Sequence, residues 1–457
     1  MFREYDLRGK ESRDELNESS MYFIGRGFGT YLRGLNITKA VVGRDGRNTS
    51  KSFQGMAIKG LMECGINVTD IGLVTTPMSY WAQYFLKTKG LLTVTASHNP
   101  AGWNGVKLGT NFSSTLLTQE LQDLYNIIAE EKFASGKGDL EKKDISDQYM
   151  KDLISNATVS KKFKILVNTG NGTAGLYVPK LLRLANCEVI EHFTALDPTY
   201  PNYTPNTDGT AMMEDTGRQT VKNNCDLGFA FDGDGDRLGL VDEKGNIVWP
   251  DRYIILLSRL VLSSHPGAKI VFDVKVSEAL PEDIKAHGGI PIMWKTGHSY
   301  IKAKLKEEKA ALAGEMSGHI FFVDDFYGFD DASFAALKLL EYLSRQSKPL
   351  SKIISQTPYY VSTPTIQVST TDEEKYKVVA KLTQEFKDEG YRVIDINGAR
   401  VYTDKGWGLV RASSNTPTLV LRFEAKTKEG LEKIKSVFKK KLDKFSSVSK
   451  NWDSSGR

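Results

Sequence analysis

Short apolar runs that end in polar or glycine turns recur along the chain. Three of them occupy residues 40–45, 164–170 and 269–273. Their Val, Ile, Leu and Phe content is typical of short buried strands. After the second run, Tyr177 and Leu181 recur at helical spacing, and other helical patterns follow the first and third. The repeated strand-turn-helix unit predicts α/β domains built on mixed or parallel sheets.

The spacing of these units predicts several domains of one kind. The runs begin roughly 100 to 125 residues apart, which is too long for a solenoid repeat and natural for similar domains in series. After residue 356 the pattern changes, because Pro358 and Pro364 bracket a β-branched stretch that precedes a charged helix, a strand at 419–423 and a Lys-rich helix. We therefore predict three related α/β mixed-sheet domains and a smaller C-terminal α+β domain, at residues 1–146, 147–248, 249–357 and 358–457.

Composition limits the classes of partner. The chain has 457 residues, of which 40% are hydrophobic and 26% charged, with a formal net charge of +5. Lys and Arg alternate with Asp and Glu, and the lysines of the last helix lie between its apolar positions, so we expect no nucleic-acid partner. A small anionic substrate suits the mild positive charge. We expect a monomer or a weak homo-oligomer.

Cysteine usage and hydropathy bear on the compartment. Cys64, Cys187 and Cys225 are far apart and form no C-x-x-C pair, so neither a disulfide framework nor a thiolate zinc site is indicated. The chain opens on charged residues, and no apolar run approaches the roughly 20 residues that span a bilayer. We expect a cytoplasmic protein with no membrane partner.

Two motifs carry candidate chemistry. Residues 95–100 (Thr-Ala-Ser-His-Asn-Pro) place the hydroxyl of Ser97 in a turn, where it is either a nucleophile or a serine bonded to its own backbone. Asp232, Asp234 and Asp236 alternate with glycines, so their carboxylates can converge on one hard cation such as Mg²⁺. The alternative is a solvated acidic turn between strands. Together the two motifs indicate phosphoryl transfer at a divalent metal.

Two later motifs suggest ligand contacts. We expect a helix with Leu312 on its inner face and Gly314 as its C-terminal cap, followed by Glu315 and Ser317 as neighbouring hydrogen-bonding groups. An acidic solvent loop is the alternative, and His319 is either a ligand contact or a structural hydrogen-bonding group. The loop from residue 411 suits a phosphate that is bound but not transferred, or a polar hairpin, and its polar residues are Arg411, Ser413, Ser414, Asn415 and Thr416.

The motifs at 95–100, 232–237, 314–319 and 411–416 resemble, in this order, the four signatures of the α-D-phosphohexomutases. The segments 5–9 and 295–298 match as well, and the phosphomannomutase/phosphoglucomutase branch is the most similar. One departure is the doubled serine at 413–414, which leaves open which groups of that loop donate from side chains. The resemblance covers the full length and implies a four-domain enzyme around a central cleft, with one signature in each domain.

The resemblance also implies roles for individual residues. Ser97 would carry a phosphoryl group in the resting enzyme, and the three aspartates with an oxygen of the phosphoserine would bind one Mg²⁺. Glu315 and Ser317 would hold sugar hydroxyls. Further contacts to the sugar or its phosphates are expected from Arg237, Lys295, His319 and the Arg411 loop. Candidates for proton transfer or charge stabilisation are Arg8, Lys107 and His298, of which Arg8 is a poor base because its pKa is above about 12.

The activity implied is the reversible conversion of a hexose 1-phosphate into its 6-phosphate through a hexose 1,6-bisphosphate. Mannose and glucose are both expected as substrates. A phosphoglucosamine mutase is an alternative, although residues 2–9 and Met316 differ from the pattern of that branch. A sugar-phosphate-binding protein without activity and a metal-dependent phosphatase are alternatives from other classes. Because the bisphosphate must turn over without escaping, the fourth domain is expected to act as a lid.

Overall fold

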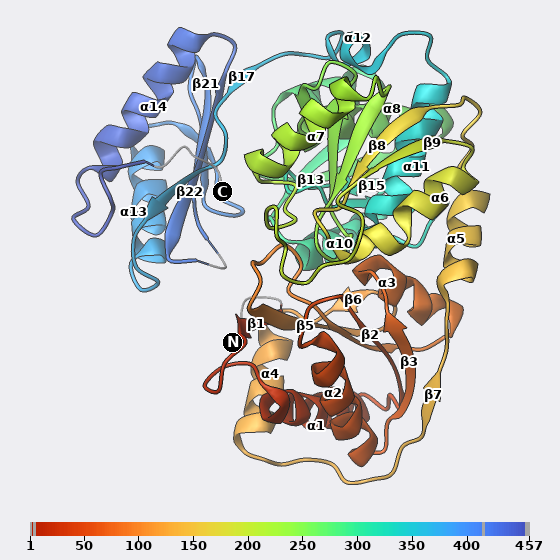
Figure 1. Cartoon of the computed structure of the whole chain (residues 1–457). Coiled ribbons are helices and arrows are strands. Elements are labelled where there is room, and N and C mark those ends of the chain that lie inside the picture. The colour runs from red at the N-terminus through yellow and green to blue at the C-terminus, as the bar shows by residue number, and fades with distance from the viewer. Residues whose placement is uncertain (1, 3–5, 414–415, 453–457) are drawn as a thin grey trace. The chain divides into compact units, whose positions relative to one another are not determined.

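The computed structural model describes residues 2, 6–413 and 416–452 (Figure 1). Its contacts group the chain into two compact units, and each is described by itself. The first unit holds Met1–Thr207, Ala211–Pro250 and Ser317–Ser351. The second holds Asp208–Thr210, Asp251–Met316 and Lys352–Arg457.

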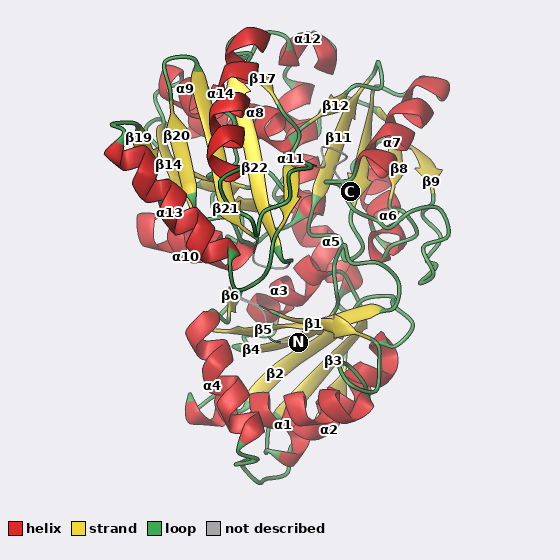
Figure 2. Ribbon diagram, turned by 90° about the vertical axis from the view of Figure 1, so that its left-hand side faces the viewer, coloured by secondary structure: helices red, strands yellow, loops and turns green. Residues whose placement is uncertain are grey.

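The first sheet of the first unit is mixed. Strands β4, β2, β3 and β7 run parallel, β5 lies antiparallel beside β4, and β1 pairs antiparallel with β5 at the edge of the sheet. Its strands are β1 (Leu7–Lys10), β2 (Lys39–Arg44), β3 (Asn67–Leu73), β4 (Gly90–Val94), β5 (Trp103–Thr110), β6 (Ser114–Thr115) and β7 (Leu140–Lys142). Helices α1 (Glu18–Gly34), α2 (Ser50–Glu63) and α4 (Thr118–Ala129) cover one face, and α3 (Thr76–Phe85) covers the other (Figure 2).

The apolar faces of these helices explain their placement. Met21 and Phe28 of α1, Leu61 of α2 and Leu124 of α4 join Val42 of the sheet in one buried cluster. Asn17 caps α1, because its side chain accepts from the amide of Ser20. Because the helices pack on the two faces of the sheet, the carboxyl ends of its parallel strands continue into loops.

The second sheet of the first unit has the order β12-β11-β10-β8-β9. Strands β10, β8 and β9 are parallel, whereas β10, β11 and β12 form an antiparallel meander. The strands are β8 (Lys164–Asn168), β9 (Glu188–His192), β10 (Leu227–Phe231), β11 (Leu238–Asp242) and β12 (Ile247–Val248). The other elements of this part are α5 (Ser146–Ser155), the 3₁₀ turn Thr173–Leu176, α6 (Val178–Leu184), α7 (Thr210–Lys222), β16 (Ile320–Phe322) and α11 (Ala332–Ser344).

The second unit contains a parallel arrangement and an antiparallel sheet. In the first, β13 (Lys269–Asp273) lies between β14 (Ile290–Trp294) and β15 (Leu312–Gly314). The antiparallel sheet has the order β17-β22-β21-β20-β19, and β18 pairs with β22. Its strands are β17 (Val361–Ser362), β18 (Ile366–Ser369), β19 (Arg392–Ile394), β20 (Ala399–Tyr402), β21 (Gly406–Ala412) and β22 (Thr418–Ala425). The helices are α8 (Pro250–Ser264), α9 (Ala279–Ala286), α10 (His298–Glu308), α12 (Leu350–Ile354), α13 (Lys375–Asp388) and α14 (Lys428–Leu442).

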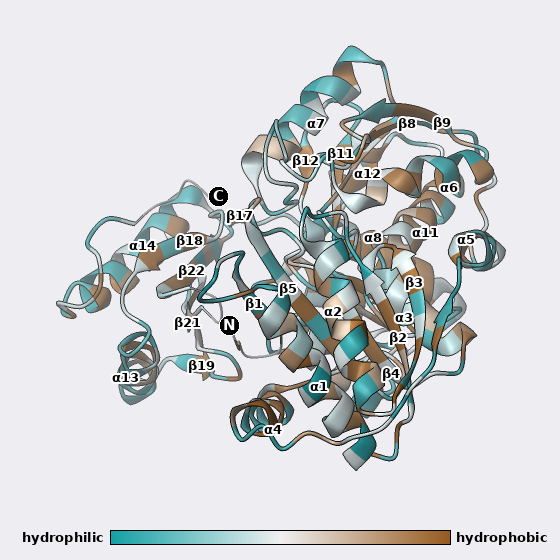
Figure 3. Cartoon of the chain, turned by 60° about the horizontal axis from the view of Figure 1, so that its bottom comes forward, coloured by the Kyte–Doolittle hydropathy of each residue, from teal (hydrophilic) through white to brown (hydrophobic). Residues whose placement is uncertain are grey.

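Helices α13 and α14 show why the last sheet has one covered face. Leu382 and Phe386 of α13 and Ile434 and Phe438 of α14 are buried in one apolar cluster, which also contains Phe423 of β22. In Figure 3 both helices carry hydrophilic and hydrophobic positions on different sides. The lysines of α14 therefore lie mainly on the side away from the core.

The predicted fold class, three α/β mixed-sheet domains and a smaller α+β domain, is confirmed. Strands begin at residues 39, 164 and 269, one residue before the first predicted run and at the first residue of the other two, and the last strand and helix are present. The predicted helix that Gly314 would cap is wrong. Helix α10 ends earlier, at Lys309 in the left-handed conformation, and Leu312 and Gly314 belong to β15. Leu312 is buried as a strand residue beside Ile270, so its burial alone did not distinguish helix from strand.

Candidate active site and metal centre

Ser97 lies in the loop between β4 and β5, which is a tight connection between antiparallel neighbours. Its φ is +50°, in the left-handed region, and the residue is 1% exposed. Its amide donates to Oγ1 of Thr95 at 2.9 Å, and its own Oγ donates to Oδ2 of Asp232 at 2.7 Å. The hydroxyl is therefore aimed at the aspartate loop and is not bonded to its own backbone.

The aspartate loop connects β10 to β11. Gly233 permits the close approach of the serine loop, since a Cβ built there would lie 2.5 Å from the carbonyl oxygen of Ser97. Oδ1 of Asp232 accepts from three backbone amides at 3.1 Å, those of Gly235, Asp236 and Arg237. The loop thus folds around the first carboxylate, and the alternative of a solvated acidic turn is excluded because all three aspartates are 0% exposed.

The charges of this cluster oppose one another. Oxygens of Asp232, Asp234 and Asp236 lie within 4.8 Å of each other. Burial, and then the charges of Asp236 and Asp234, raise the pKa of Asp232 well above its usual value. Lys107 of β5 donates to Oδ2 of Asp234 at 2.9 Å and also to Asp236. Burial alone would lower the pKa of Lys107, but these carboxylates outweigh it and raise the pKa well above its usual value.

The donor set fits a hard divalent cation. Oδ1 of Asp234 and Oδ1 of Asp236 are buried and make no hydrogen bond within the described part of the chain. Buried carboxylate oxygens without donors are the ligands that Mg²⁺ or Ca²⁺ takes up. Thr76 and Thr95 donate to Oδ2 of Asp234 at 2.5 and 3.2 Å. The sequence motifs gave no role to Thr76, which begins α3 far from the aspartate loop in the chain.

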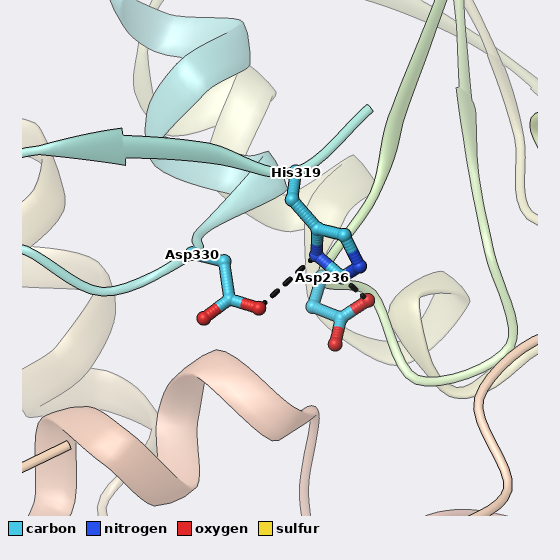
Figure 4. Close-up of side chains that lie close together, drawn as sticks. All are labelled: Asp236, His319 and Asp330. Carbon is cyan, nitrogen blue, oxygen red and sulfur yellow. Dashed lines mark ion pairs between the residues drawn. The ribbon is translucent and has the colours of Figure 1, made fainter. Parts of the chain in front are cut away.

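Arg237 and His319 extend the cluster. Nε of Arg237 donates to Nε2 of His319 at 3.1 Å and lies 3.9 Å from Oδ2 of Asp232. Nδ1 of His319 lies 3.0 Å from Oδ2 of Asp330 and 3.6 Å from Oδ1 of Asp236 (Figure 4). Burial lowers the pKa of His319, but the charge of Asp236 and the interaction with Asp330 outweigh it, so its pKa is raised. Asp330 was not among the predicted site residues.

Arg8 of β1 contacts the serine loop. Its Nε donates to Oδ2 of Asp6 at 2.7 Å, and its Nη1 donates to Oδ1 of Asn99 at 2.8 Å. Arg8 is 7% exposed, and these two bonds hold its guanidinium in place. Because Asn99 is in the loop that carries Ser97, Arg8 contacts that loop directly. Its position suits orientation of the loop or of a phosphate.

In the second unit, two of the predicted loops are joined. The amide of Gly297 donates to Oε1 of Glu315 at 2.6 Å. Asp273, at the end of β13, accepts from Oγ1 of Thr296 at 2.9 Å and from the amide of Met316 at 3.2 Å. The carboxylate of Asp273 therefore connects the loop at 295–298 with the loop that carries Glu315.

The remaining residues of these loops are placed as follows. His298 is the first residue of α10 and is 4% exposed. Nζ of Lys295 lies 5.5 Å from the ring centre of Tyr300. Nζ of Lys275, which the motifs did not single out, lies 3.5 Å from Oδ2 of Asp273. Lysine and histidine side chains thus gather at the carboxyl end of β13.

The Arg411 loop connects β21 to β22 as an antiparallel hairpin. Arg411 is 7% exposed, and Oγ of Ser413 accepts from the amide and from Oγ1 of Thr416 at 3.2 and 2.9 Å. Ser414 and Asn415 lie outside the described residues. The hairpin is present, and a hairpin can also hold a phosphate, so the geometry permits both readings of this motif.

The structure brings together part of the predicted site. Contacts within the first unit join Ser97, the three aspartates, Lys107, Arg237 and His319. Ser317 is also in this unit and is 7% exposed. Lys295, His298, Glu315 and Arg411 belong to the second unit. The boundary between the units falls between Met316 and Ser317, inside one motif.

Known families match the chain in four consecutive parts. Three are described as the alpha/beta/alpha domains I, II and III of phosphoglucomutase/phosphomannomutase, at residues 1–135, 147–245 and 249–360, and the fourth as its C-terminal domain, at 366–441. A phosphomannomutase/phosphoglucomutase of Pseudomonas aeruginosa is 41% identical over 442 residues, which cover 97% of this chain and 95% of the relative. The chain belongs to the phosphoglucomutase/phosphomannomutase family.

Other relatives agree with this membership in the phosphohexomutases. A phosphoglucomutase of Neisseria gonorrhoeae is 38% identical over 443 residues, covering 96% of both chains. The solved structure of a phosphoglucomutase/phosphomannomutase family protein from Burkholderia thailandensis is 37% identical, with a TM-score of 0.91, and covers 97% of this chain and 96% of that one. The family resemblance and the enzyme class expected from the motifs are confirmed.

Proposed function

We propose that this phosphohexomutase interconverts the 1-phosphates and 6-phosphates of mannose and glucose through a phosphorylated Ser97. The observation that carries the proposal is the buried bond between Oγ of Ser97 and Oδ2 of Asp232, inside a cluster of three carboxylates and Lys107. A hydroxyl nucleophile and a hard-cation site in one buried pocket are the parts that phosphoryl transfer requires. The names of the relatives support mannose and glucose as the sugars.

In the proposed reaction, phospho-Ser97 donates its phosphoryl group to the free hydroxyl of the sugar phosphate. The bond between Oγ of Ser97 and phosphorus breaks, a bond from the sugar oxygen to phosphorus forms, and the hydroxyl proton leaves to a base. The hexose 1,6-bisphosphate then reorients end over end and returns its other phosphate to Ser97. One serine therefore serves both orientations of the sugar.

We infer that Asp232, Asp234 and Asp236 hold one Mg²⁺, which supplies neutralisation of phosphoryl charge when bound. The orphaned oxygens of Asp234 and Asp236 support this inference. Around them, Lys107 and Arg237 place two further positive charges beside Ser97. Developing negative charge on the transferred group would therefore meet fixed cations in a buried site.

We propose that the other loops singled out by the motifs bind the rest of the substrate. Glu315 and Ser317 would hold sugar hydroxyls, Lys295 and His319 would contact the sugar or its phosphate, and the loop of Arg411, Ser413, Ser414, Asn415 and Thr416 would grip the phosphate that is not transferred. The bond between Gly297 and Glu315 supports a shared role for the 295–298 loop. We also propose that the fourth domain acts as a lid over the bound substrate.

The base stays open between Lys107 and His298, with Arg8 orienting phosphate. The raised pKa of Lys107 favours it as a charged partner of the carboxylates over a neutral base. His298, the first residue of helix α10, carries an imidazole, the side chain most often used as a general base. These two facts favour His298, and a loose transition state would reduce the demand on either group.

The helices of the chain bear on its possible membrane partners. Within the residues that the structure describes, no helix combines the length and the apolar character needed to cross a bilayer. We propose a small phosphosugar as the partner, a monomer or weak homo-oligomer as the state, and the cytoplasm as the compartment.

A coupled assay tests the proposed function. Mannose 1-phosphate and glucose 1-phosphate are supplied with Mg²⁺ and a trace of glucose 1,6-bisphosphate, and formation of the 6-phosphates is followed beside Ser97→Ala. Turnover of both sugars that collapses in the variant supports the proposal. No turnover of either sugar, with turnover of glucosamine phosphate, favours a phosphoglucosamine mutase. Steady release of inorganic phosphate points to a phosphatase, and no reaction at all favours a binding protein.

A further inference from the structure

Arg47 uses every N–H of its guanidinium on the loop that carries Ser97 and on one carboxylate. It follows β2, fifty residues before the serine, and its side chain is 2% exposed. Nε donates to Oδ2 of Asp45 at 3.2 Å. The four remaining N–H groups donate to four backbone carbonyls, those of Ser97 at 2.7 Å, Asn99 at 2.6 Å, Pro100 at 2.9 Å and Trp103 at 3.0 Å.

These four carbonyls belong to a strained part of the chain. Ser97 holds a φ of +50°, which a residue with a Cβ adopts at a cost. Such a conformation persists only where its surroundings hold it. The bonds from Arg47 to the carbonyls of Ser97 and Asn99 fix the peptide plane between Ser97 and His98 and the one between Asn99 and Pro100. The direction of the Ser97 side chain follows from those planes.

Arg47 is itself held in place from two sides. Oδ1 of Asp45 accepts from the amide of Arg47 at 3.0 Å and from Oγ of Ser50 at 2.5 Å, which fixes the carboxylate. The guanidinium carbon also lies 5.3 Å from the ring centre of Tyr200, a residue that comes much later in the sequence of the first unit. The clamp is therefore rigid before any ligand binds.

Arg8 contacts the same loop in a different way. Its shorter bond goes to the side chain of Asn99, and its contact with the carbonyl of Ala96 is 3.4 Å long. Arg8 therefore leaves the carbonyls of Ser97, Asn99 and Trp103 to Arg47. Arg47, in contrast, donates all five of its guanidinium N–H groups to protein oxygens and has none left for a phosphate.

We propose that Arg47 is a positioning residue for phosphoryl transfer, which keeps Oγ of Ser97 directed at Asp232 whether or not the serine is phosphorylated. The proposal deepens the proposed function and rests on it. Each half-reaction changes the charge on Ser97, and a loop held through its phosphate would move at that moment. A loop held through its carbonyls stays in place. Lysine cannot replace this clamp, because a single ammonium has three donors and no planar fork.

The test compares Arg47→Lys and Arg47→Ala with Arg26→Ala. Arg26 is a matched control in the same domain, since it pairs with Glu63, reaches the carbonyl of Ala134 and lies over the ring of Phe133, away from the serine loop. The Arg47 variants are expected to lose kcat by about 100-fold, the loss typical of a displaced reacting group, with KM changed less than about twofold. Arg26→Ala should lower the thermal midpoint and leave kcat unchanged.

Two further readouts separate positioning from a general loss of stability. Hydrogen exchange of residues 95–104 should accelerate in Arg47→Lys and stay unchanged in Arg26→Ala. Guanidinium ion added to Arg47→Ala should restore part of kcat. Wild-type kcat in Arg47→Lys, or exchange at 95–104 that equals wild type, would overturn the proposal. If the wild type turned over no hexose phosphate, the proposed function would fail, and the exchange measurement would still decide whether Arg47 holds the loop.

Discussion

Oδ2 of Asp330 lies 3.0 Å from Nδ1 of His319, and both residues are buried. The other ring nitrogen of His319 accepts from Nε of Arg237. Since Nε of an arginine is always a donor, this bond requires Nε2 to be the unprotonated nitrogen, and the proton then lies on Nδ1, beside Asp330. Asp330 thus fixes the ring that in turn holds Arg237 next to the aspartate loop.

We predict that Asp330→Asn lowers kcat of the mutase by about 10- to 100-fold, the loss typical for a carboxylate that orients a functional histidine. The amide can present an N–H to Nδ1, which favours the wrong tautomer and releases Arg237. Steady-state kinetics with glucose 1-phosphate measure the change. Asp152→Asn is the control, because Asp152 is bonded to Trp81 and Tyr327 elsewhere in the first unit. Equal losses in both variants would contradict an orienting role.

Removal of the metal gives a second prediction. Treatment with a chelator should abolish turnover, and Mg²⁺ should restore it, because without a cation the three carboxylates repel one another, and Lys107, paired with two of them, and Arg237 offset only part of their charge beside the phosphoryl group. Without metal, Asp232→Asn should raise the thermal midpoint, since burial and the two other carboxylates disfavour the charge of Asp232. The same variant should lose the increase in midpoint that Mg²⁺ gives to the wild type. A wild-type midpoint that does not respond to Mg²⁺ would argue against a cation site.

The sequence motifs singled out residues that lie within short local patterns. Ser97 and the three aspartates could be named as candidates, because a hydroxyl in a turn and carboxylates that alternate with glycines are local patterns, and the structure places these side chains together. Arg47 and Asp330 could not, since each acts through a tertiary contact with a partner far away in the chain and stands in no recognisable motif. A nucleophile loop with a positive φ requires an external clamp, but its sequence does not say which residue supplies it.

The error at Gly314 has a similar cause. Apolar residues at helical spacing continue past the end of α10, and the helix ends at Lys309, whose left-handed conformation no pattern announced. Leu312 then pairs in parallel with Ile270, a contact between residues 42 positions apart in the printed sequence. Short strands of this kind depend on their neighbours in the sheet, so local periodicity cannot distinguish them from a helix end.

A third prediction concerns the buried arginine of the antiparallel sheet. Arg400 is 0% exposed, and its Nη1 donates to the carbonyls of Val274 and Val276 at 2.6 and 2.8 Å. Its guanidinium carbon lies 3.6 Å from the ring centre of Trp407. These bonds attach β20 to the segment that follows β13, within the second unit.

Arg400→Ala should therefore destabilise the second unit, by about 1–3 kcal/mol for each buried carbonyl left without a donor. Urea unfolding, followed by tryptophan fluorescence, measures the loss. Arg392→Ala is the matched control, since Arg392 lies over the ring of Tyr402 with an exposed side chain and should change stability little. If the two variants unfolded at the same urea concentration, Arg400 would not hold the segment.

The last prediction concerns the pH dependence of stability at Asp331, the N-cap of α11. Burial raises the pKa of its carboxyl to about 7, although the amide of Phe334 and the hydroxyl of Tyr149 both donate to it and oppose the shift. Because the folded protein binds this proton more tightly than the unfolded chain, the stabilisation is present below pH 4 and is lost as the pH rises towards about 7.

Asp331→Asn keeps an acceptor for the cap and cannot ionise. Between pH 4 and 8 its free energy of unfolding should therefore rise relative to wild type. Asp144→Asn is the control and should show no such change between pH 5 and pH 8, since the hydroxyl and amide of Ser146 lower the pKa of Asp144 and its ionisation is complete below that range. Urea unfolding at pH 5 and pH 8 measures both differences, and a difference between Asp331→Asn and wild type that does not change with pH would mean that Asp331 ionises normally in the folded protein.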